Sequence, residues 1–175
     1  IRARLFTLFL LPLFVLVFFQ ARTILQNWKE YQLYVSQMEN IELIQATDSV
    51  ISALQKERGL SAIFVGSGEE RSTVNAQRST VDATIEALIP FVERTTYLPL
   101  KVKDLKESLQ QNRDEIDSGK LKTYDAVIDA YTVFVRSLMS IQNKAVNQPT
   151  VGGLGKVMAS MALLQEAAEG AARSR

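Results

Sequence analysis

Apolar side chains recur every three to four residues through most of the chain, and no convincing alternating run of the kind found in strands follows residue 25. This spacing puts the apolar side chains on one face of a helix, so it predicts an all-α fold. The stripe of a helix expected over residues 71–96 consists of Val74, Arg78, Val81, Ile85, Leu88 and Val92. The stripe of a helix expected over residues 121–146 consists of Tyr124, Val127, Tyr131, Phe134, Leu138 and Ile141.

Glycine and proline mark the ends of the predicted helices. The boundaries lie at residues 66–68, 97–99, 117–119 and 147–153. The first helix runs to about Phe64, with a break or bend near Glu39–Asn40 left open, and a fifth begins near Leu154. Because short connections between long helices favour antiparallel neighbours, we expect an antiparallel up-down bundle and the start of a second bundle at the C-terminus.

The N-terminal part of the chain has a different pattern. Residues 5–19, LFTLFLLPLFVLVFF, are uncharged and nearly all apolar, with arginines at positions 2, 4 and 22. A spanning helix needs about 20 apolar residues, and positive flanks stay in the cytoplasm. We therefore expect a transmembrane signal anchor over residues 1–25 and an extracytoplasmic helical domain over residues 26–175. A cleaved signal peptide is the alternative, although no small-x-small pattern follows the apolar run.

Arg58 occupies a position in the first helix where the pattern requires a core side chain. The seam around it consists of Ile44, Thr47, Ile51, Leu54, Ser61 and Val65. A guanidinium keeps its charge, and burying it without a partner costs several kcal/mol, so Arg58 requires an anion unless its head rotates to solvent. That anion is either a carboxylate on a neighbouring helix or a bound ligand.

Arg78 repeats this anomaly on the second helix. It falls between Val74 and Val81, so adjacent antiparallel helices direct two guanidinium groups towards one interior. The Ser61 hydroxyl and nearby glycines let further donors approach a small anion there. A surface position or an ion pair with a neighbouring carboxylate is the alternative for Arg78.

The composition narrows the chemistry further. The chain has no cysteine and no histidine, which removes nucleophile–imidazole catalysis and the usual zinc ligands. We therefore expect no enzyme, no catalytic residue, no metal and no cofactor. Of 20 basic and 19 acidic residues, three arginines flank the apolar segment, leaving 17 against 19 elsewhere. This balance does not suggest a nucleic-acid surface.

Several segments together resemble the nitrate- and nitrite-sensing (NIT) domain of bacterial membrane receptors. They are RARLFTLFLLPL at the N-terminus, LQKERGLSAIFVGSG at 54–68, QRSTVDA at 77–83, NRDEIDSGKL at 112–121, YTVFV at 131–135 and ALLQEAAEGAAR at 162–173. The resemblance covers most of the chain. It implies two stacked helical bundles outside the bacterial inner membrane, coupled to cytoplasmic outputs such as chemotaxis signalling or histidine kinase modules.

The resemblance also implies a ligand, nitrate or nitrite, held by arginines. Matching motifs assign this role to Arg58 and Arg173, and Arg78 and Ser61 complete the predicted ligand-binding set. The closing helix reads AEGAAR where the family has AAGxER, which leaves the identity of the anion open. Without a ligand, Arg173 and Glu169 are explained as an ordinary surface ion pair.

The expected partners are therefore a small anion, membrane lipid and a second copy of the chain in a homodimer. A ligand that binds one packing arrangement better than another shifts the helices, and we expect this shift to carry the signal across the membrane. Two alternatives stay open. One is a helical ectodomain for another small anion or a solute-binding protein, and the other is a membrane-anchored structural bundle with Arg58 merely ion-paired.

Overall fold

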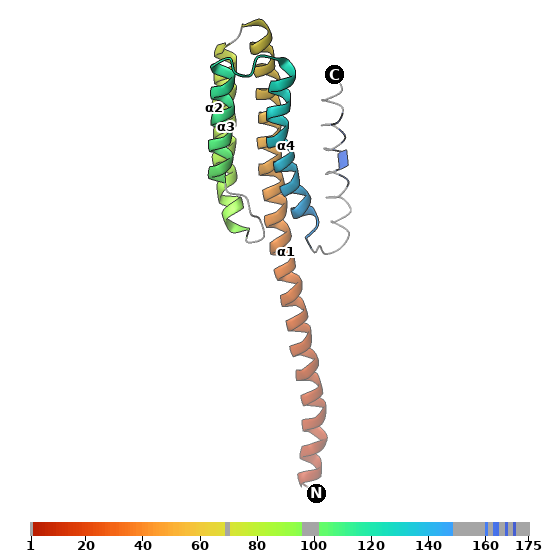
Figure 1. Ribbon diagram of the computed structural model, residues 1–175. Coiled ribbons are helices and arrows are strands. Elements are labelled where there is room, and N and C mark those ends of the chain that lie inside the picture. Colours follow the sequence, from red (N-terminus) through yellow and green to blue (C-terminus); the bar gives the residue numbers. More distant parts are fainter. Residues whose placement is uncertain are drawn as a thin grey trace.

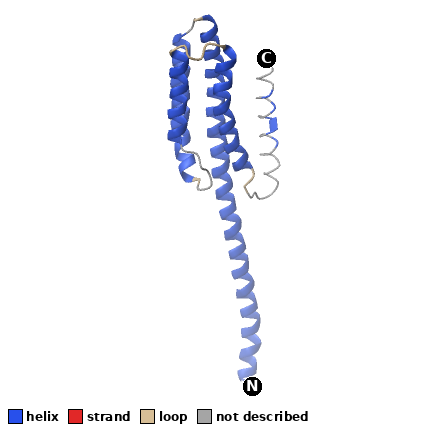
Figure 2. Cartoon of the chain, in the orientation of Figure 1, coloured by secondary structure: helices blue, strands red, loops and turns tan. Residues whose placement is uncertain are grey.

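The chain folds into helices throughout the part that a computed structural model describes, namely residues 2–68, 71–95 and 102–148 with Ser160, 163, 164, 167 and 170. Side chains are not described for residues 2–9 and 11. The helices are α1 (Arg2–Ser67), α2 (Arg71–Arg94), α3 (Val102–Asp117) and α4 (Tyr124–Val146). No strand occurs among these residues, which confirms the all-α class (Figure 2). The fifth helix, predicted from about residue 154, lies largely outside them.

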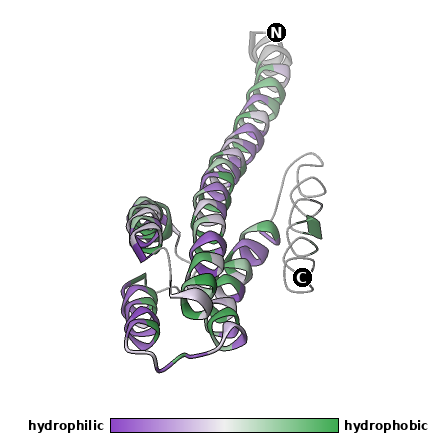
Figure 3. Ribbon diagram, turned by 90° about the horizontal axis from the view of Figure 1, so that it is seen from above, coloured by the Kyte–Doolittle hydropathy of each residue, from purple (hydrophilic) through white to green (hydrophobic). Residues whose placement is uncertain are grey.

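The four helices pack around one another at the C-terminal half of α1. Helix α1 contacts α2 and α4, and α3 contacts the same two helices. Successive helices run in opposite directions, and the N-terminal half of α1 extends far beyond the other three (Figure 1). Hydrophilic and hydrophobic residues are both present on every helix (Figure 3). The buried apolar side chains of all four helices form one core between them, at the level of α2, α3 and α4.

Helix α1 is a single element of 66 residues. The helix continues without interruption through Glu39–Asn40, the position of the possible break or bend, and Asn40 is buried there. Near its N-terminus the helix carries large exposed apolar side chains, and Phe14 exposes 73% of its surface. In the part of the chain that the structure describes, however, no helix is both long and apolar enough to cross a membrane. The anchor predicted over residues 1–25 is therefore not supported by these residues.

The predicted core positions are largely confirmed. In α2 the buried apolar side chains are Val74, Val81, Ile85, Leu88 and Val92. In α4, Val127, Tyr131, Leu138 and Ile141 are buried as predicted. Tyr124 is 54% exposed and Phe134 is half-buried, whereas Val135 is buried, so the buried face of α4 differs from the predicted stripe. Tyr124 is the first residue of α4, where a side chain has fewer neighbours to cover it.

Two glycines end helices in the left-handed conformation that side chains with a Cβ disfavour. Gly68 after α1 has φ 74° and its N–H donates to the Phe64 carbonyl. Gly119 after α3 has φ 71° and its N–H donates to the Ile116 carbonyl. Both lie in the predicted turns. Thr123 is the N-cap of the next helix, α4, and its hydroxyl accepts a hydrogen bond from the Ala126 N–H.

Candidate functional site

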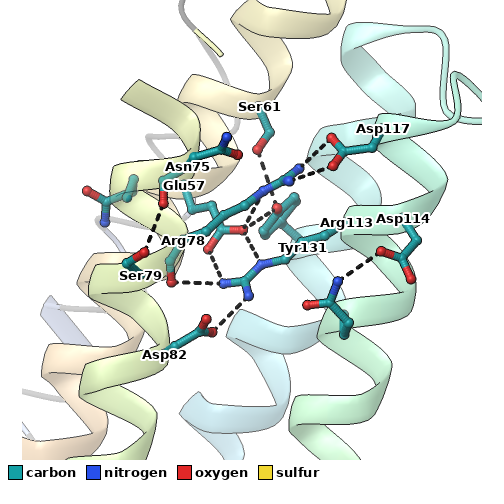
Figure 4. Close-up of polar contacts among 12 residues, drawn as sticks. Glu57, Ser61, Asn75, Arg78, Ser79, Asp82, Arg113, Asp114, Asp117 and Tyr131 are labelled. Atoms are coloured by element: carbon teal, nitrogen blue, oxygen red, sulfur yellow. Dashed lines mark hydrogen bonds and ion pairs between the residues drawn. The ribbon is translucent and has the colours of Figure 1, made fainter. Parts of the chain in front are cut away.

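Glu57 lies on the inward face of α1 and is completely buried. It belongs to the series Val50, Leu54, Glu57 and Ser61, whose steps of four, three and four residues keep one helical face. All four side chains are buried. A carboxylate that is removed from water requires hydrogen-bond donors from the protein. Side chains from the other three helices lie around the Glu57 carboxylate (Figure 4).

Arg113 of α3 provides the principal counter-charge for Glu57. Its Nε donates to Oε1 of Glu57 at 2.8 Å, and its Nη2 donates to Oε2 at 2.9 Å. The Nη1 group donates to Oδ1 of Asp82 on α2 at 2.8 Å. Burial lowers the pKa of Arg113, but the hydrogen bonds and charges of Glu57 and Asp82 outweigh it, so this pKa lies above its ordinary value. The paired contact is a strong, charge-assisted one.

Arg78 of α2 forms a second fork beside the first. Its Nη1 and Nη2 donate to Oδ2 and Oδ1 of Asp117, at the end of α3, at 2.8 and 3.0 Å. These hydrogen bonds are the main reason that the pKa of Asp117 lies below its ordinary value. The Nε of Arg78 is buried without a hydrogen-bond partner and lies 3.9 Å from Oε1 of Glu57. Arg78 is thus ion-paired with a neighbouring carboxylate, which was the alternative to a ligand-binding role for this residue.

Tyr131 connects α4 to the same carboxylate. Its hydroxyl donates to Oε1 of Glu57 at 2.7 Å and lies 3.3 Å from Oγ of Ser61. Burial, and then the charge of Glu57, raise the pKa of Tyr131 above its ordinary value. The phenol therefore stays protonated at neutral pH and remains a donor. Ser61, one of the predicted ligand-binding residues, reaches the site through this phenol.

Arg58 follows Glu57 in the sequence but contacts a different residue of α4. Its side chain is only 5% exposed, and its Nη1 donates to Oγ1 of Thr132 at 3.3 Å. The Thr132 hydroxyl donates in turn to the Ile128 carbonyl at 2.7 Å. Two consecutive residues of α1 thus meet two consecutive residues of α4. The predicted seam position of Arg58 is confirmed.

Glu57 belongs to α1, and side chains from the other three helices surround it. We call the following residues the Glu57 cluster: Glu57, Arg78, Asp82, Arg113, Asp117 and Tyr131. Arg78 comes from α2, Arg113 from α3 and Tyr131 from α4 (Figure 4). Because these side chains are hydrogen-bonded to one another, the cluster links the four helices at one level of the bundle.

Most of the chain matches one protein family. A family model described as nitrate and nitrite sensing (NIT) matches residues 49–175. The chain belongs to the NIT family. The resemblance inferred from the motifs is thereby confirmed, and the general function that this family implies is sensing rather than catalysis.

The NIT match starts at residue 49, so it includes Arg58 and the complete Glu57 cluster. Neither a curated protein nor a solved structure matches the chain. The half of α1 that extends beyond the other helices precedes the matched range. The family assignment therefore rests on the part of the chain that contains the buried charges.

Only some residues of this candidate site were predicted from the sequence. The structure brings Ser61 and Arg78 to the Glu57 cluster and places Arg58 beside it, whereas Arg173 lies outside the described residues. Glu57 and Arg113 were not predicted. The helical period contained a signal for Glu57, because it follows Val50 and Leu54 in a buried series. No comparable signal in the sequence paired it with Arg113.

Among the residues that the structure describes, no group of three or more acidic side chains could hold a metal ion.

One open groove of about 670 Å³ lies between α1 and α2 and is lined by residues that include Glu42, Ser49 and Arg94. It contains neither Arg58 nor any member of the Glu57 cluster.

Proposed function

We propose that this NIT domain binds nitrate or nitrite at the contact between α1 and α4, with Arg58 as the principal guanidinium, as the sensing part of a bacterial membrane receptor. The observation that carries the proposal is the burial of Arg58, 5% exposed, within the range that matches the family. Nitrate is flat and has oxygens spaced like those of a carboxylate, so it suits the planar fork of a guanidinium.

The position of Arg58 suggests how a ligand changes the packing of the helices. Its neighbour Glu57 is hydrogen-bonded to Tyr131, while Arg58 itself donates to Thr132. An anion that draws Arg58 away from Thr132 changes the α1–α4 contact one residue from the buried carboxylate. A ligand shifts an equilibrium only by its difference in affinity for the two arrangements, and this contact supplies such a difference. We propose that Arg173, from the closing motif, is a second ligand-binding residue.

The expected result for Arg58 is a loss of nitrate affinity. We expect isothermal titration calorimetry of the complete chain to show nitrate binding that becomes roughly 10- to 100-fold weaker in Arg58→Ala, since charge-assisted hydrogen bonds are worth about 1.5–3 kcal/mol. Arg136, exposed on α4, offers a matched control, and Arg136→Ala should bind as the wild type does. A folded wild-type chain that binds neither nitrate nor nitrite would contradict the proposal and favour the structural bundle.

The N-terminal apolar segment supports attachment to a membrane. The described residues there include Leu13, Phe14 and Phe19, all exposed, and a helix that is apolar on every side suits lipid. We propose that residues 5–19 insert into the inner membrane and that the bundle stands outside it.

Membrane attachment has a direct test. After extraction with alkaline carbonate, the wild-type chain should stay in the membrane pellet, and the variant with Phe14→Arg and Phe18→Arg should move to the supernatant. Each arginine at mid-membrane costs about 2.5–3.5 kcal/mol on insertion scales. Val133→Arg adds a charge at an exposed site of α4 and should leave the protein in the pellet. Recovery of the wild-type chain in the supernatant would rule out the attachment.

A further inference from the structure

We propose that Arg113, Tyr131 and the Nε of Arg78 form a second site for a planar oxyanion. The Glu57 carboxylate occupies this site, so Glu57 competes with a free anion for it. This inference deepens the proposed function and rests on it only for the class of ligand. It assigns Glu57 a specificity role that is distinct from the anion binding assigned to Arg58. The chemical class is a small trigonal oxyanion such as nitrate or formate.

The donors around Glu57 form the arrangement that such an anion requires. The Arg113 fork donates to both carboxylate oxygens at 2.8 and 2.9 Å, and the Tyr131 hydroxyl donates to one of them at 2.7 Å. A free anion with two oxygens in the same plane accepts the same three hydrogen bonds. The site therefore recognises the planar arrangement of two oxygens, whether they belong to Glu57 or to a free anion.

One further donor distinguishes nitrate from the carboxylate. The Nε of Arg78 is buried and has no hydrogen-bond partner, and it lies 3.9 Å from Oε1 of Glu57. The Arg78 side chain is 12% exposed, so this donor has lost most of its access to water. A carboxylate has two oxygens, whereas nitrate has three. A nitrate ion is not tied to α1, so it can shift until one of its oxygens accepts from this N–H, which the carboxylate leaves without a partner.

A carboxylate fixed on α1 has a high effective concentration at these donors. A ligand anion meets the site in competition with Glu57, and its apparent affinity equals the intrinsic affinity multiplied by the fraction of molecules in which the carboxylate has left. Glu57 thus keeps the site closed at low anion concentration. It also ties α1 to α2, α3 and α4 when no ligand is bound.

Removal of the carboxylate provides the test. In the complete chain, Glu57→Ala should lower the melting temperature, because it leaves Arg113 buried without its fork partner. At 100 mM, formate and nitrate should raise the melting temperature of this variant by roughly 5–10 °C, as expected for binding near 1 mM. The wild-type chain should gain less than half as much, since its site is filled. Chloride and sulfate at equal ionic strength should have little effect, because neither is trigonal and planar.

Glu57→Gln is the matched control. Its amide keeps the volume of the side chain and blocks the site, so this variant should melt lower than the wild type and gain nothing specific from formate or nitrate. The proposal is overturned if all four salts stabilise Glu57→Ala equally, if none does, or if the variant stays unfolded in both formate and nitrate. Recovery of folding only in these two salts supports it.

The two proposals fail independently. In a double variant with Glu57→Ala and Arg58→Ala, stabilisation by formate should persist, because the second site does not contain Arg58. Loss of that stabilisation in the double variant would count against a separate site. Nitrate binding by the wild type that depends on Arg58, without rescue of Glu57→Ala, leaves the proposed function standing and removes this inference.

Discussion

Replacement of Arg113 by methionine is expected to lower the free energy of unfolding by about 3–5 kcal/mol, because breaking a buried ion pair leaves an uncompensated charge. Glu57 is completely buried, and Arg113 donates to both of its carboxylate oxygens. In the variant, Tyr131 is the remaining hydrogen-bond donor to that carboxylate within the Glu57 cluster. Urea denaturation followed by circular dichroism measures the loss as a decrease in the midpoint at constant slope.

Two further variants separate charge from geometry at this position. Arg113→Lys keeps the charge but not the fork, so it should lose stability, though less than the methionine variant. Adding Glu57→Leu to Arg113→Met should recover much of the loss, because apolar side chains that replace a complete buried pair are often neutral. A methionine variant within 1 kcal/mol of the wild type would show that the carboxylate finds another partner.

Replacement of Tyr131 by alanine should cost a similar amount, about 3–5 kcal/mol, because it removes a large and completely buried aromatic side chain from the core. The ring packs edge-on against Phe134 with centroids 6.5 Å apart, and its hydroxyl contacts Glu57 and Ser61. The alanine variant leaves a cavity beside the carboxylate. The same urea titration measures the effect.

The tyrosines of α4 offer matched controls. Tyr131→Phe keeps the ring and removes one donor to Glu57, so we expect a loss of about 1–3 kcal/mol. Tyr124 is 54% exposed on the same helix, and Tyr124→Ala should change the stability by less than about 0.5 kcal/mol. Equal losses at positions 124 and 131 would contradict the assignment of Tyr131 to the core.

The helical core could be predicted because burial repeats with the helical period. Val81 and Leu88 of α2 are buried where the pattern placed them. Arg78 departs from the stripe because its long side chain carries the guanidinium to Asp117 at the bundle edge. The preceding Gln77 is buried instead and donates to the Ala53 carbonyl. Periodicity thus identifies the face of a helix to within one residue.

The Glu57 cluster could not be predicted in the same way. Periodicity shows which face of α1 Glu57 occupies, but its partner Arg113 is 56 residues further along the chain. Whether these two residues lie at the same height depends on the lengths of α2 and of the connections before and after it. Beside Arg58, an acidic residue also looks like an ordinary surface charge. The buried position of Arg58 was predicted from the sequence, whereas the burial of the carboxylate next to it was not.

The length of α1 has a mechanical consequence. At 1.5 Å per residue, a continuous helix of 66 residues is about 100 Å long, and Arg58 lies about 60 Å from Phe19. From the buried charges near Arg58, most of the helix extends towards its N-terminus. A tilt of about 5° at Arg58 displaces Phe19 by about 5 Å, which is close to one helical turn. A small change in the direction of this helix within the bundle therefore becomes a much larger displacement at its N-terminal end.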